Sequence, residues 1–404
     1  MKIGDVAKFQ NGFAFKSSDF KKNGKFPIIK IKELKDGEVK FFSDSVCVDV
    51  DLDAGYRKFL VQEGDVLFAL TGDPVNKPNP LSWVGRVSVY NHKEEALINQ
   101  RVCKLLPTKK VNPKYIYYFF RDFENFYRLA SLATGSASQA NISTKAIENV
   151  EIDIPPINVQ NRMIEYLDAI SKKIEINNQI NDNLESQLLL IYKSWFIDLE
   201  PFNKILPDDW GSSPLGEKCN CLLGGTPSRN KPEFWNGTIP WINSGKVNSF
   251  RIIEPSEYIT VLGLEKSATK LLPAKTVVIA ITGATLGQVS LLEIDSCANQ
   301  SVVGILQNEE IPYEFIYPFI KFKINELISH QTGGAQQHIN KQNVENIIIQ
   351  IPSKNVMKKY INTVSPMYEL IENICIENQK LLQLRNTLLP KLISGELDIS
   401  DIEF

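Results

Sequence analysis

Motifs that could bind nucleotides or transfer groups are incomplete in this sequence of 404 residues. Residues 283–288 resemble half of a phosphate-binding loop, but they lack the Lys and the hydroxyl residue that hold phosphates and magnesium. The segment Gly245-Lys246-Val247 also has no hydroxyl residue after its Lys. Residues 153–156, Asp-Ile-Pro-Pro, differ from the Asn/Asp-Pro-Pro-Tyr/Phe signature of adenine methyltransferases and are typical of a strand-to-helix junction. We therefore expect a noncatalytic chain that binds no cofactor itself.

The histidines and cysteines have no spacing that is typical of a metal site. Cys219 and Cys221 are separated by one residue, unlike the Cys-x-x-Cys pairs of zinc sites. The remaining residues of these types are scattered: Cys47, Cys103, Cys297, Cys375, His92, His330 and His338. We expect no zinc site and no disulfide framework, and we interpret the cysteines as buried or idle thiols.

Polar side chains in turn-rich segments could instead recognise DNA bases, because amides, hydroxyls and cations match the donor and acceptor patterns of the major groove. An ordinary solvated loop is the alternative for each of them. Gln139 and Gln336 stand out because they recur after Gly-containing turns, although a shared hydrogen bond that braces the loop would explain this equally well. The candidates in the first half of the chain are Lys16, Ser17, Lys21, Lys22, Asn76, Lys77, Gln139, Asn141 and Lys145; those in the second half are Arg229, Asn230, Lys231, Lys246, Thr282, Thr285, Gln336, Gln337 and His338.

The elements that position these residues occur twice, about 200 residues apart. Residues 138–155 match residues 335–352, and both end in an apolar run that is followed by Pro. Three earlier pairs keep the same order: residues 69–72 with 280–283, 85–87 with 287–289, and 99–100 with 299–300. The chain is therefore a diverged tandem duplication.

Each repeat predicts a mixed α/β (α+β) segment followed by a helical one. The mixed segments cover residues 1–155 and 201–351, and the helical ones cover 156–200 and 352–404. Apolar runs bounded by Gly, Pro and Asn predict strands at 26–31, 65–70, 276–281 and 347–351, and helices are expected at 114–132 and 313–329.

The helical segments carry apolar residues at alternating spacings of three and four, which is the seam of a coiled coil. We expect Pro366 to kink the second helix or delay its start. The first seam is Met163, Leu167, Ile170, Ile174, Asn177, Asn181, Leu184, Leu188, Ile191 and Trp195; the second is Tyr360, Val364, Met367, Ile371, Ile374, Asn378, Leu381, Arg385, Leu388 and Leu392.

Connectivity predicts that these two helices pair antiparallel, with one mixed segment at each end and pseudo-two-fold symmetry. A helix of about 40 residues is roughly 60 Å long, so the two mixed segments could lie at least one DNA turn, roughly 34 Å, apart. Asn177, Asn181 and Asn378 occupy seam positions, where Asn lowers stability but selects one register. A solvated gap between the helices is the alternative.

Charge and hydropathy limit the possible functions. The 45 Lys and Arg against 47 Asp and Glu leave a net charge of −2, which argues against a simple basic protein that coats DNA. If DNA is the ligand, a basic partner should supply part of the phosphate attraction. No stretch approaches the roughly 18 apolar residues of a membrane helix, and the N-terminus lacks an apolar signal core, so a cytoplasmic location without membrane contact is expected.

The helical segments resemble those of the specificity (S) subunits of type I restriction-modification systems, the HsdS family. The resemblance lies in residues 155–164, 174–181, 192–202 and 206–210, and in residues 388–397, which read Leu-Leu-Pro-Lys-Leu-Ile-Ser-Gly-Glu-Leu. It extends over essentially the whole chain, because the family alternates target recognition domains with conserved helices. The junction at Pro352-Ser353 departs from the more typical Pro155-Pro156.

The resemblance implies that each mixed segment reads one half of a bipartite asymmetric site in double-stranded DNA. The helices would set the spacer and dock two methyltransferase (M) subunits, which use S-adenosylmethionine, and restriction (R) subunits would add ATP- and magnesium-dependent activities. Phe196 and Leu389, near the helix ends, are candidates for methyltransferase docking, with a core position as the alternative. Two other readings remain open: a specificity subunit of a fused methyltransferase-nuclease system, and a noncatalytic scaffold that binds proteins or glycans.

Overall fold

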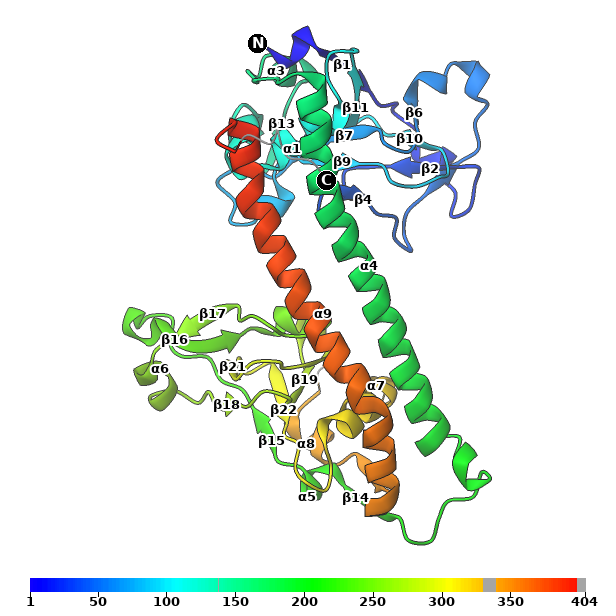
Figure 1. The fold of residues 1–404 in the computed structure, drawn as a ribbon, viewed down its shortest axis with the longest axis vertical. Coiled ribbons are helices and arrows are strands. Elements are labelled where there is room, and N and C mark those ends of the chain that lie inside the picture. The colour runs from blue at the N-terminus through cyan, green and yellow to red at the C-terminus, as the bar shows by residue number, and fades with distance from the viewer. Residues whose placement is uncertain (137, 330–338, 398–404) are drawn as a thin grey trace. The chain divides into compact units, whose positions relative to one another are not determined.

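The computed structural model describes residues 1–136, 138–329 and 339–397. The chain divides into two compact units, which we call unit 1 (Met1–Lys173 with Leu381–Phe404) and unit 2 (Ile174–Lys380). Both long helices, α4 (Ile157–Phe196) and α9 (Lys354–Ser394), contribute a segment to each unit (Figure 1).

Unit 1 contains three sheets, with strand orders β1-β11-β7-β9-β4-β3, β5-β2-β10-β6 and β12-β13-β8. Its strands are β1 (Ala7–Asn11), β2 (Phe26–Ile29), β3 (Leu34–Lys35), β4 (Glu38–Val39), β5 (Cys47–Val48), β6 (Leu60–Val61), β7 (Val66–Ala69), β8 (Thr71–Gly72), β9 (Val87–Val89), β10 (Ala96–Ile98), β11 (Val102–Pro107), β12 (Thr134–Ser136) and β13 (Gln139–Asn141). Its shorter helices are α1 (Pro113–Arg121), α2 (Phe123–Ser131) and α3 (Thr144–Glu148).

Unit 2 contains sheets with strand orders β15-β22-β19-β20, β17-β16-β21-β18 and β14-β23. Its strands are β14 (Gly211–Pro214), β15 (Cys221–Leu223), β16 (Trp235–Ile242), β17 (Glu257–Ile259), β18 (Leu271–Leu272), β19 (Val277–Ala280), β20 (Val289–Leu291), β21 (Ser296–Ala298), β22 (Val302–Ile305) and β23 (Ile348–Ile351). Its shorter helices are α5 (Leu215–Lys218), α6 (Val261–Glu265), α7 (Tyr313–Ser329) and α8 (Lys341–Glu345).

The two units repeat one topology, as the duplicated sequence predicts. The antiparallel order β1-β11-β7-β9 of unit 1 corresponds to β15-β22-β19-β20 of unit 2. In the second sheet of each unit a central parallel pair, β2 with β10 or β16 with β21, is flanked by antiparallel strands. The predicted fold class, two mixed α/β units with a pair of long antiparallel helices, is confirmed.

Strands β7 and β19 are apolar throughout because both of their faces are buried. In β7, Val66 and Phe68 contribute to one core cluster, whereas Leu67 and Ala69 contribute to another. Strand β19 alternates in the same way between the two main clusters of unit 2. A continuous apolar run, rather than an alternating one, is the expected pattern for such a strand.

Two details of the helices differ from the prediction. The helix expected at 114–132 is divided into α1 and α2, because the carboxylate of Asp122 accepts a hydrogen bond from the backbone N–H of Asn125 (3.1 Å) and caps a new helix. The late start expected near Pro366 is wrong, since α9 begins at Lys354 and is continuous through this proline. Its neighbours Val364 and Tyr368 are buried in the core of unit 2 and hold the helix there.

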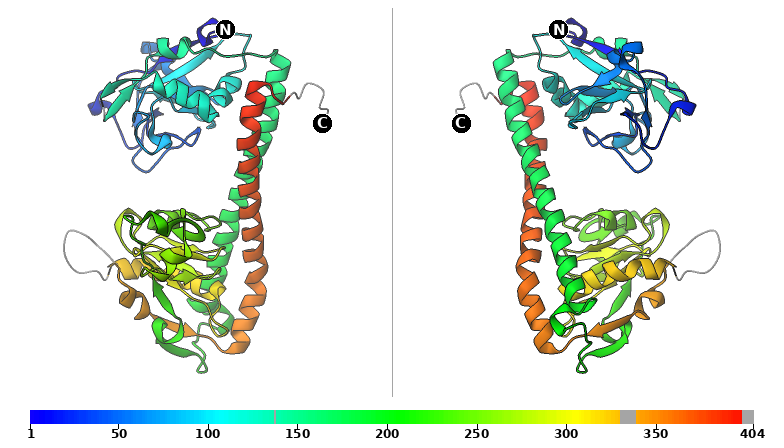
Figure 2. Two further views of the ribbon diagram at one scale, coloured as in Figure 1. Left: turned by 90° about the vertical axis from the view of Figure 1, so that its left-hand side faces the viewer. Right: turned by 90° about the vertical axis from the view of Figure 1, so that its right-hand side faces the viewer.

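The long helices pack against each other within each unit (Figure 2). In unit 1, Met163 and Leu167 of α4 share a core with Leu389 and Leu392 of α9. In unit 2, residues with higher numbers on α4 contact residues with lower numbers on α9. Asn177 contacts Asn378, Asn181 contacts Cys375, and Tyr192 contacts Tyr360. The two helices are therefore antiparallel.

Candidate nucleic-acid interface

Three of the predicted loops of unit 1 meet at one edge of its six-stranded sheet. Strands β1 and β7 run antiparallel to β11, with Asn11 opposite Cys103 and Ala69 opposite Val102, so the C-terminal ends of β1 and β7 lie beside the N-terminal end of β11. The β12–β13 hairpin joins this edge through β8, which follows β7. The candidates that these segments carry are exposed: Lys16 and Ser17 after β1, Asn76 and Lys77 after β8, and Gln139 in β13. We call this region the loop edge.

A hydrogen-bond network at the loop edge contains an arginine that the sequence had not singled out. Arg101, immediately before β11, is exposed, and its Nη1 donates to Thr71 Oγ1 (3.2 Å) and Asn141 Oδ1 (3.1 Å). The buried Thr71 hydroxyl donates in turn to the same oxygen of Asn141 (2.9 Å). The signal in the sequence was the position of Arg101, directly after the repeated Asn99-Gln100 pair.

The network changes the interpretation of Asn141. Reading adenine with an Asn side chain requires both the oxygen and the nitrogen of its amide, and the oxygen of Asn141 already accepts two hydrogen bonds. Asn141 therefore braces the loop edge. Gln139 is different, because its side-chain amide makes no hydrogen bond to any residue in the described part of the chain.

Unit 2 forms the equivalent edge with the equivalent strands. Leu223 at the end of β15 and Ala280 at the end of β19 lie opposite Val303 and Val302 of β22. The hydroxyl of Thr226 donates to Oε1 of Gln300, a residue of the repeated pair, which joins two of the loops. This edge carries Arg229, Asn230 and Lys231 after β15, and Thr282 and Thr285 after β19. Gln336, Gln337 and His338 lie outside the described residues.

Several predicted cations form ion pairs with carboxylates. Nζ of Lys21 lies 2.7 Å from Asp49, that of Lys145 lies 3.3 Å from Glu148, and that of Lys246 lies 2.9 Å from Glu254. Only the Lys21–Asp49 pair is exposed on both sides; such pairs contribute about 0–1 kcal/mol, so a DNA phosphate could replace this carboxylate. The Lys246 side chain (21% exposed) and the Glu148 side chain (16% exposed) are less accessible. Lys16, Lys22 and Lys77 form no ion pair with the residues that the structure describes, which makes them the readiest phosphate ligands.

Arg229 is more firmly held than the lysines. Its Nη1 and Nη2 donate to the two oxygens of Glu257, 2.5 and 2.7 Å away, and its guanidinium lies 3.5 Å from the centre of the Trp235 ring. The hydrogen bonds to Glu257 raise the pKa of Arg229 above its ordinary value. Because its planar fork is already occupied, Arg229 orders the loop and is a poorer candidate for base reading than the sequence suggested.

The two candidates for methyltransferase docking differ in burial: Leu389 lies in the core of unit 1, whereas Phe196 is half-buried and packs against the core of unit 2. The Phe196 ring lies 4.9 Å from Phe315 and 4.8 Å from Tyr360, measured between ring centres. Leu389 is 6% exposed and belongs to the core of unit 1. The alternative of a core position describes Leu389, whereas docking through the half-buried Phe196 stays a prediction.

The three seam asparagines are buried, so the alternative of a solvated gap is wrong. Asn177 Nδ2 donates to Asn378 Oδ1 (2.8 Å) and to Glu377 Oε2 (2.7 Å), and Asn378 Nδ2 donates to Asn178 Oδ1 (2.9 Å). Asn181 is less well satisfied. Its Nδ2 lies 3.5 Å from Cys375 Sγ, and its buried Oδ1 has no hydrogen-bond partner among the residues that the structure describes.

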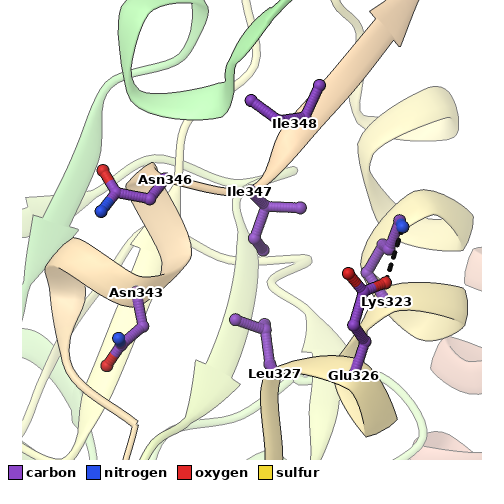
Figure 3. Close-up of a pocket in the computed structure, with 7 residues that line it drawn as sticks. All are labelled: Lys323, Glu326, Leu327, Asn343, Asn346, Ile347 and Ile348. Carbon is purple, nitrogen blue, oxygen red and sulfur yellow. Dashed lines mark hydrogen bonds and ion pairs between the residues drawn. The ribbon is translucent and has the colours of Figure 1, made fainter. Parts of the chain in front are cut away.

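A cavity of about 260 Å³ lies between α7, α8 and the start of β23 (Figure 3). Its apolar lining consists of Leu327, Ile347 and Ile348, and its polar lining includes an ion pair between Lys323 and Glu326 (2.7 Å). Oδ1 of Asn343, another lining residue, accepts a hydrogen bond from the backbone of Asn340 and caps α8. These side chains serve the local fold and do not form a nucleophile–base pair.

No group of His, Cys, Asp or Glu that could hold a metal ion occurs in residues 1–136, 138–329 or 339–397. All six cysteines are free thiols, and burial raises the pKa of Cys375 to about 11. Within the same described ranges, no helix is long and apolar enough to cross a membrane.

Two repeated units that each gather polar loops at the equivalent sheet edge define a duplicated macromolecule-recognition protein. Comparison with known proteins identifies the family. A family model described as "Type I restriction modification DNA specificity domain" matches residues 1–186 and 207–385, so the chain belongs to this family. The predicted family is confirmed, and the chain is a noncatalytic specificity subunit of the type I restriction-modification class.

Individual relatives extend over most of the chain. The type I restriction enzyme MjaIX specificity subunit of Methanocaldococcus jannaschii is 26% identical over 326 residues, covering 77% of this chain and 75% of the relative. The HindI specificity subunit of Haemophilus influenzae is 22% identical over 420 residues, covering 85% and 88%. The crystal structure of a type I S subunit from M. genitalium shares the fold, with a TM-score of 0.59, 16% identity, and coverage of 99% of this chain and 96% of that one.

Proposed function

We propose that the chain reads a bipartite asymmetric DNA site for a type I restriction-modification complex. Residues 1–155 and 201–351 would each read one half-site, and the helical segments 156–200 and 352–404 would set the spacer. The observation that carries this proposal is the repeated loop edge, because equivalent strand ends in both units present polar side chains of diverged sequence. Diverged readers suit half-sites that differ in sequence.

The proposed complex contains two methyltransferase subunits, which bring S-adenosylmethionine, and restriction subunits, which bring ATP- and magnesium-dependent activities. It would act on DNA in the cytoplasm. A net charge of −2 supports the need for partners, since it leaves this chain little long-range attraction for phosphates. A fused methyltransferase-nuclease partner is the alternative; a separate translocase reading frame beside the coding region would argue against it.

The proposal is tested by mapping DNA methylation. The chain is co-expressed with the methyltransferase encoded beside it in a host without DNA methylation, and modified adenines are located by single-molecule sequencing. We expect one split motif with modified adenines in both parts around a fixed gap. A soluble, active complex that modifies no motif, or a motif without a gap, would contradict the proposal.

Lys16→Ala is expected to weaken binding to all duplex sequences by a similar factor, because an unpaired lysine at the loop edge is suited to a phosphate. Loss of one phosphate contact should make the slope of log K against log salt concentration shallower by about 0.9. Fluorescence anisotropy of the assembled complex over a range of salt concentrations measures this slope. Lys93→Ala is the matched control, since Lys93 is exposed beyond the C-terminal end of β9, at the opposite edge of the sheet. Equal slopes for both variants would remove Lys16 from the interface.

A further inference from the structure

We propose that Arg101 reads a guanine in the half-site that unit 1 recognises, an inference that rests on the proposed function and adds a specificity-determining residue to it. Arg101 is exposed at the loop edge, between Phe13, whose backbone accepts from Gln100 N–H, and the β12–β13 hairpin. Arg101 therefore lies next to segments that carry candidate DNA-contact residues, the loop after β1 and the β12–β13 hairpin.

The hydrogen bonds of Arg101 hold one side of its guanidinium and leave the other side available. Nη1 is engaged by Thr71 and Asn141, whereas Nε and Nη2 donate no hydrogen bond to the residues that the structure describes. An arginine edge with two parallel donors matches O6 and N7 of guanine, which is the commonest specific contact in the major groove. A side chain fixed in this way loses less conformational entropy on binding than a free one.

Arg86 and Arg128 of unit 1 differ in this respect. Arg86 directs Nη1 and Nη2 at the backbone carbonyls of Leu81 (2.7 Å) and Ile31 (3.1 Å), and burial lowers its pKa. Arg128 donates to the carbonyl of Glu151, which pairs with Lys2 just ahead of β1, at the far edge of the sheet. Arg101 is thus an exposed, oriented guanidinium with a free donor edge at the loop edge.

The two units differ at the position of Arg101. The residue after the second Asn-Gln pair is Ser301, so unit 2 has no guanidinium at the equivalent position. Arg229, the nearest arginine in sequence order after β15, is engaged by Glu257. The contact is therefore expected in one half-site only.

The experiment compares methylation motifs of the complete complex carrying wild-type chain, Arg101→Ala, Arg101→Lys or the control Arg128→Ala. We expect one G·C position in a single half-site to become degenerate in both Arg101 variants, with a loss of roughly 5- to 150-fold in preference. Asn141→Ala should weaken the same position by less, because it removes only the brace. The other half-site, the gap and the Arg128→Ala motif should not change.

A second measurement covers the case in which Arg101→Ala abolishes methylation. The wild-type complex is then bound to duplexes in which each guanine of the half-site is replaced in turn by 7-deazaguanine, which lacks the N7 acceptor. Weaker binding at one position supports the proposal, and no effect at any position overturns it. If the wild-type complex modifies a split motif and Arg101→Ala modifies the same motif, this inference is overturned and the proposed function stands. If the wild-type complex modifies no split motif, the proposed function is refuted.

Discussion

Replacing Arg251 with Met is expected to lower the free energy of unfolding by about 3 kcal/mol, the lower end of the cost of breaking a buried ion pair. The variant loses a fully buried cation from a network in which Lys275 still pairs with Glu293 and Lys321 still pairs with Glu185. The side chain of Arg251 is completely buried in unit 2, where its Nη1 donates to the hydroxyl of Tyr317 (3.1 Å). Nη1 of Arg251 lies 3.7 Å from Oε1 of Glu185 in α4, and Nε lies 3.7 Å from Oε1 of Glu293, whose side chain is only 3% exposed. Chemical denaturation of the full chain measures the change.

The loss of stability in Arg251→Met should depend on pH in a defined direction. Burial raises the pKa of Glu293 above its ordinary value, and Arg251 is one of the neighbours that lower it again. In Arg251→Met the pKa of Glu293 should therefore rise further. The contribution of protonated Glu293 to the stability of the variant is fully present below the pKa of Glu293 in the unfolded chain. This contribution is lost as the pH rises through the higher pKa of Glu293 in the folded chain. We expect a smaller difference from wild type in acid than at neutral pH.

Two further variants test whether the buried charge is the cause. Arg251→Met combined with Glu293→Gln removes both charges and should recover part of the loss. Arg57→Met removes an exposed arginine paired with Asp53 at 2.7 Å, and should change stability by less than about 1 kcal/mol. An Arg251→Met loss as small as that of Arg57→Met would refute the assignment. A confirmed loss would mean that this cation fixes the sheets of unit 2 to the segments of α4 and α9 beside them.

Two Asn→Leu substitutions one turn apart on α4 are expected to change the free energy of unfolding in opposite directions. Asn181→Leu is expected to raise the free energy of unfolding by about 1–3 kcal/mol, because it removes a buried amide oxygen that accepts no hydrogen bond from the described part of the chain. Asn177→Leu is expected to lower it by a similar amount, because Asn378 Oδ1 then loses its donor in a buried site. Thermal and chemical unfolding of the full-length variants check both signs. Changes of the same sign in the two variants would contradict this explanation.

The stabilised variant also tests the proposed register role. A buried Asn lowers stability but penalises every alignment in which it cannot pair. Asn181→Leu should therefore broaden the distribution of gap lengths in the methylated motif as it raises the melting temperature. Unchanged melting together with an unchanged gap would show that Asn181 does not select the register.

The sequence by itself determined the repeated fold because the signals for it are local and periodic. The apolar runs at 65–70 and 276–281 predict strands, observed at Val66–Ala69 and Val277–Ala280, and the alternating seam spacing predicts the long helices. Helix α7 was predicted with its observed bounds, Tyr313–Ser329. The duplication then implied that one topology occurs twice. None of these inferences requires knowing which side chains meet.

Only the tertiary structure decided the partners of the polar residues, because those partners are distant in sequence. Arg229 and Glu257 are 28 residues apart, Arg101 and Asn141 are 40 apart, and Asn177 and Asn378 are 201 apart. The sequence gives the chemistry of a side chain but not the acceptor that will engage it. Arg229 was therefore predicted to read bases and Arg101 was not, whereas in the described part of the chain Arg229 is engaged by Glu257 and Arg101 keeps Nε and Nη2 without an acceptor. The same is true of Phe196 and Leu389, whose apolar character predicted either a core or a surface anchor. Packing placed Leu389 in the core of unit 1 and left Phe196 half-buried against the core of unit 2.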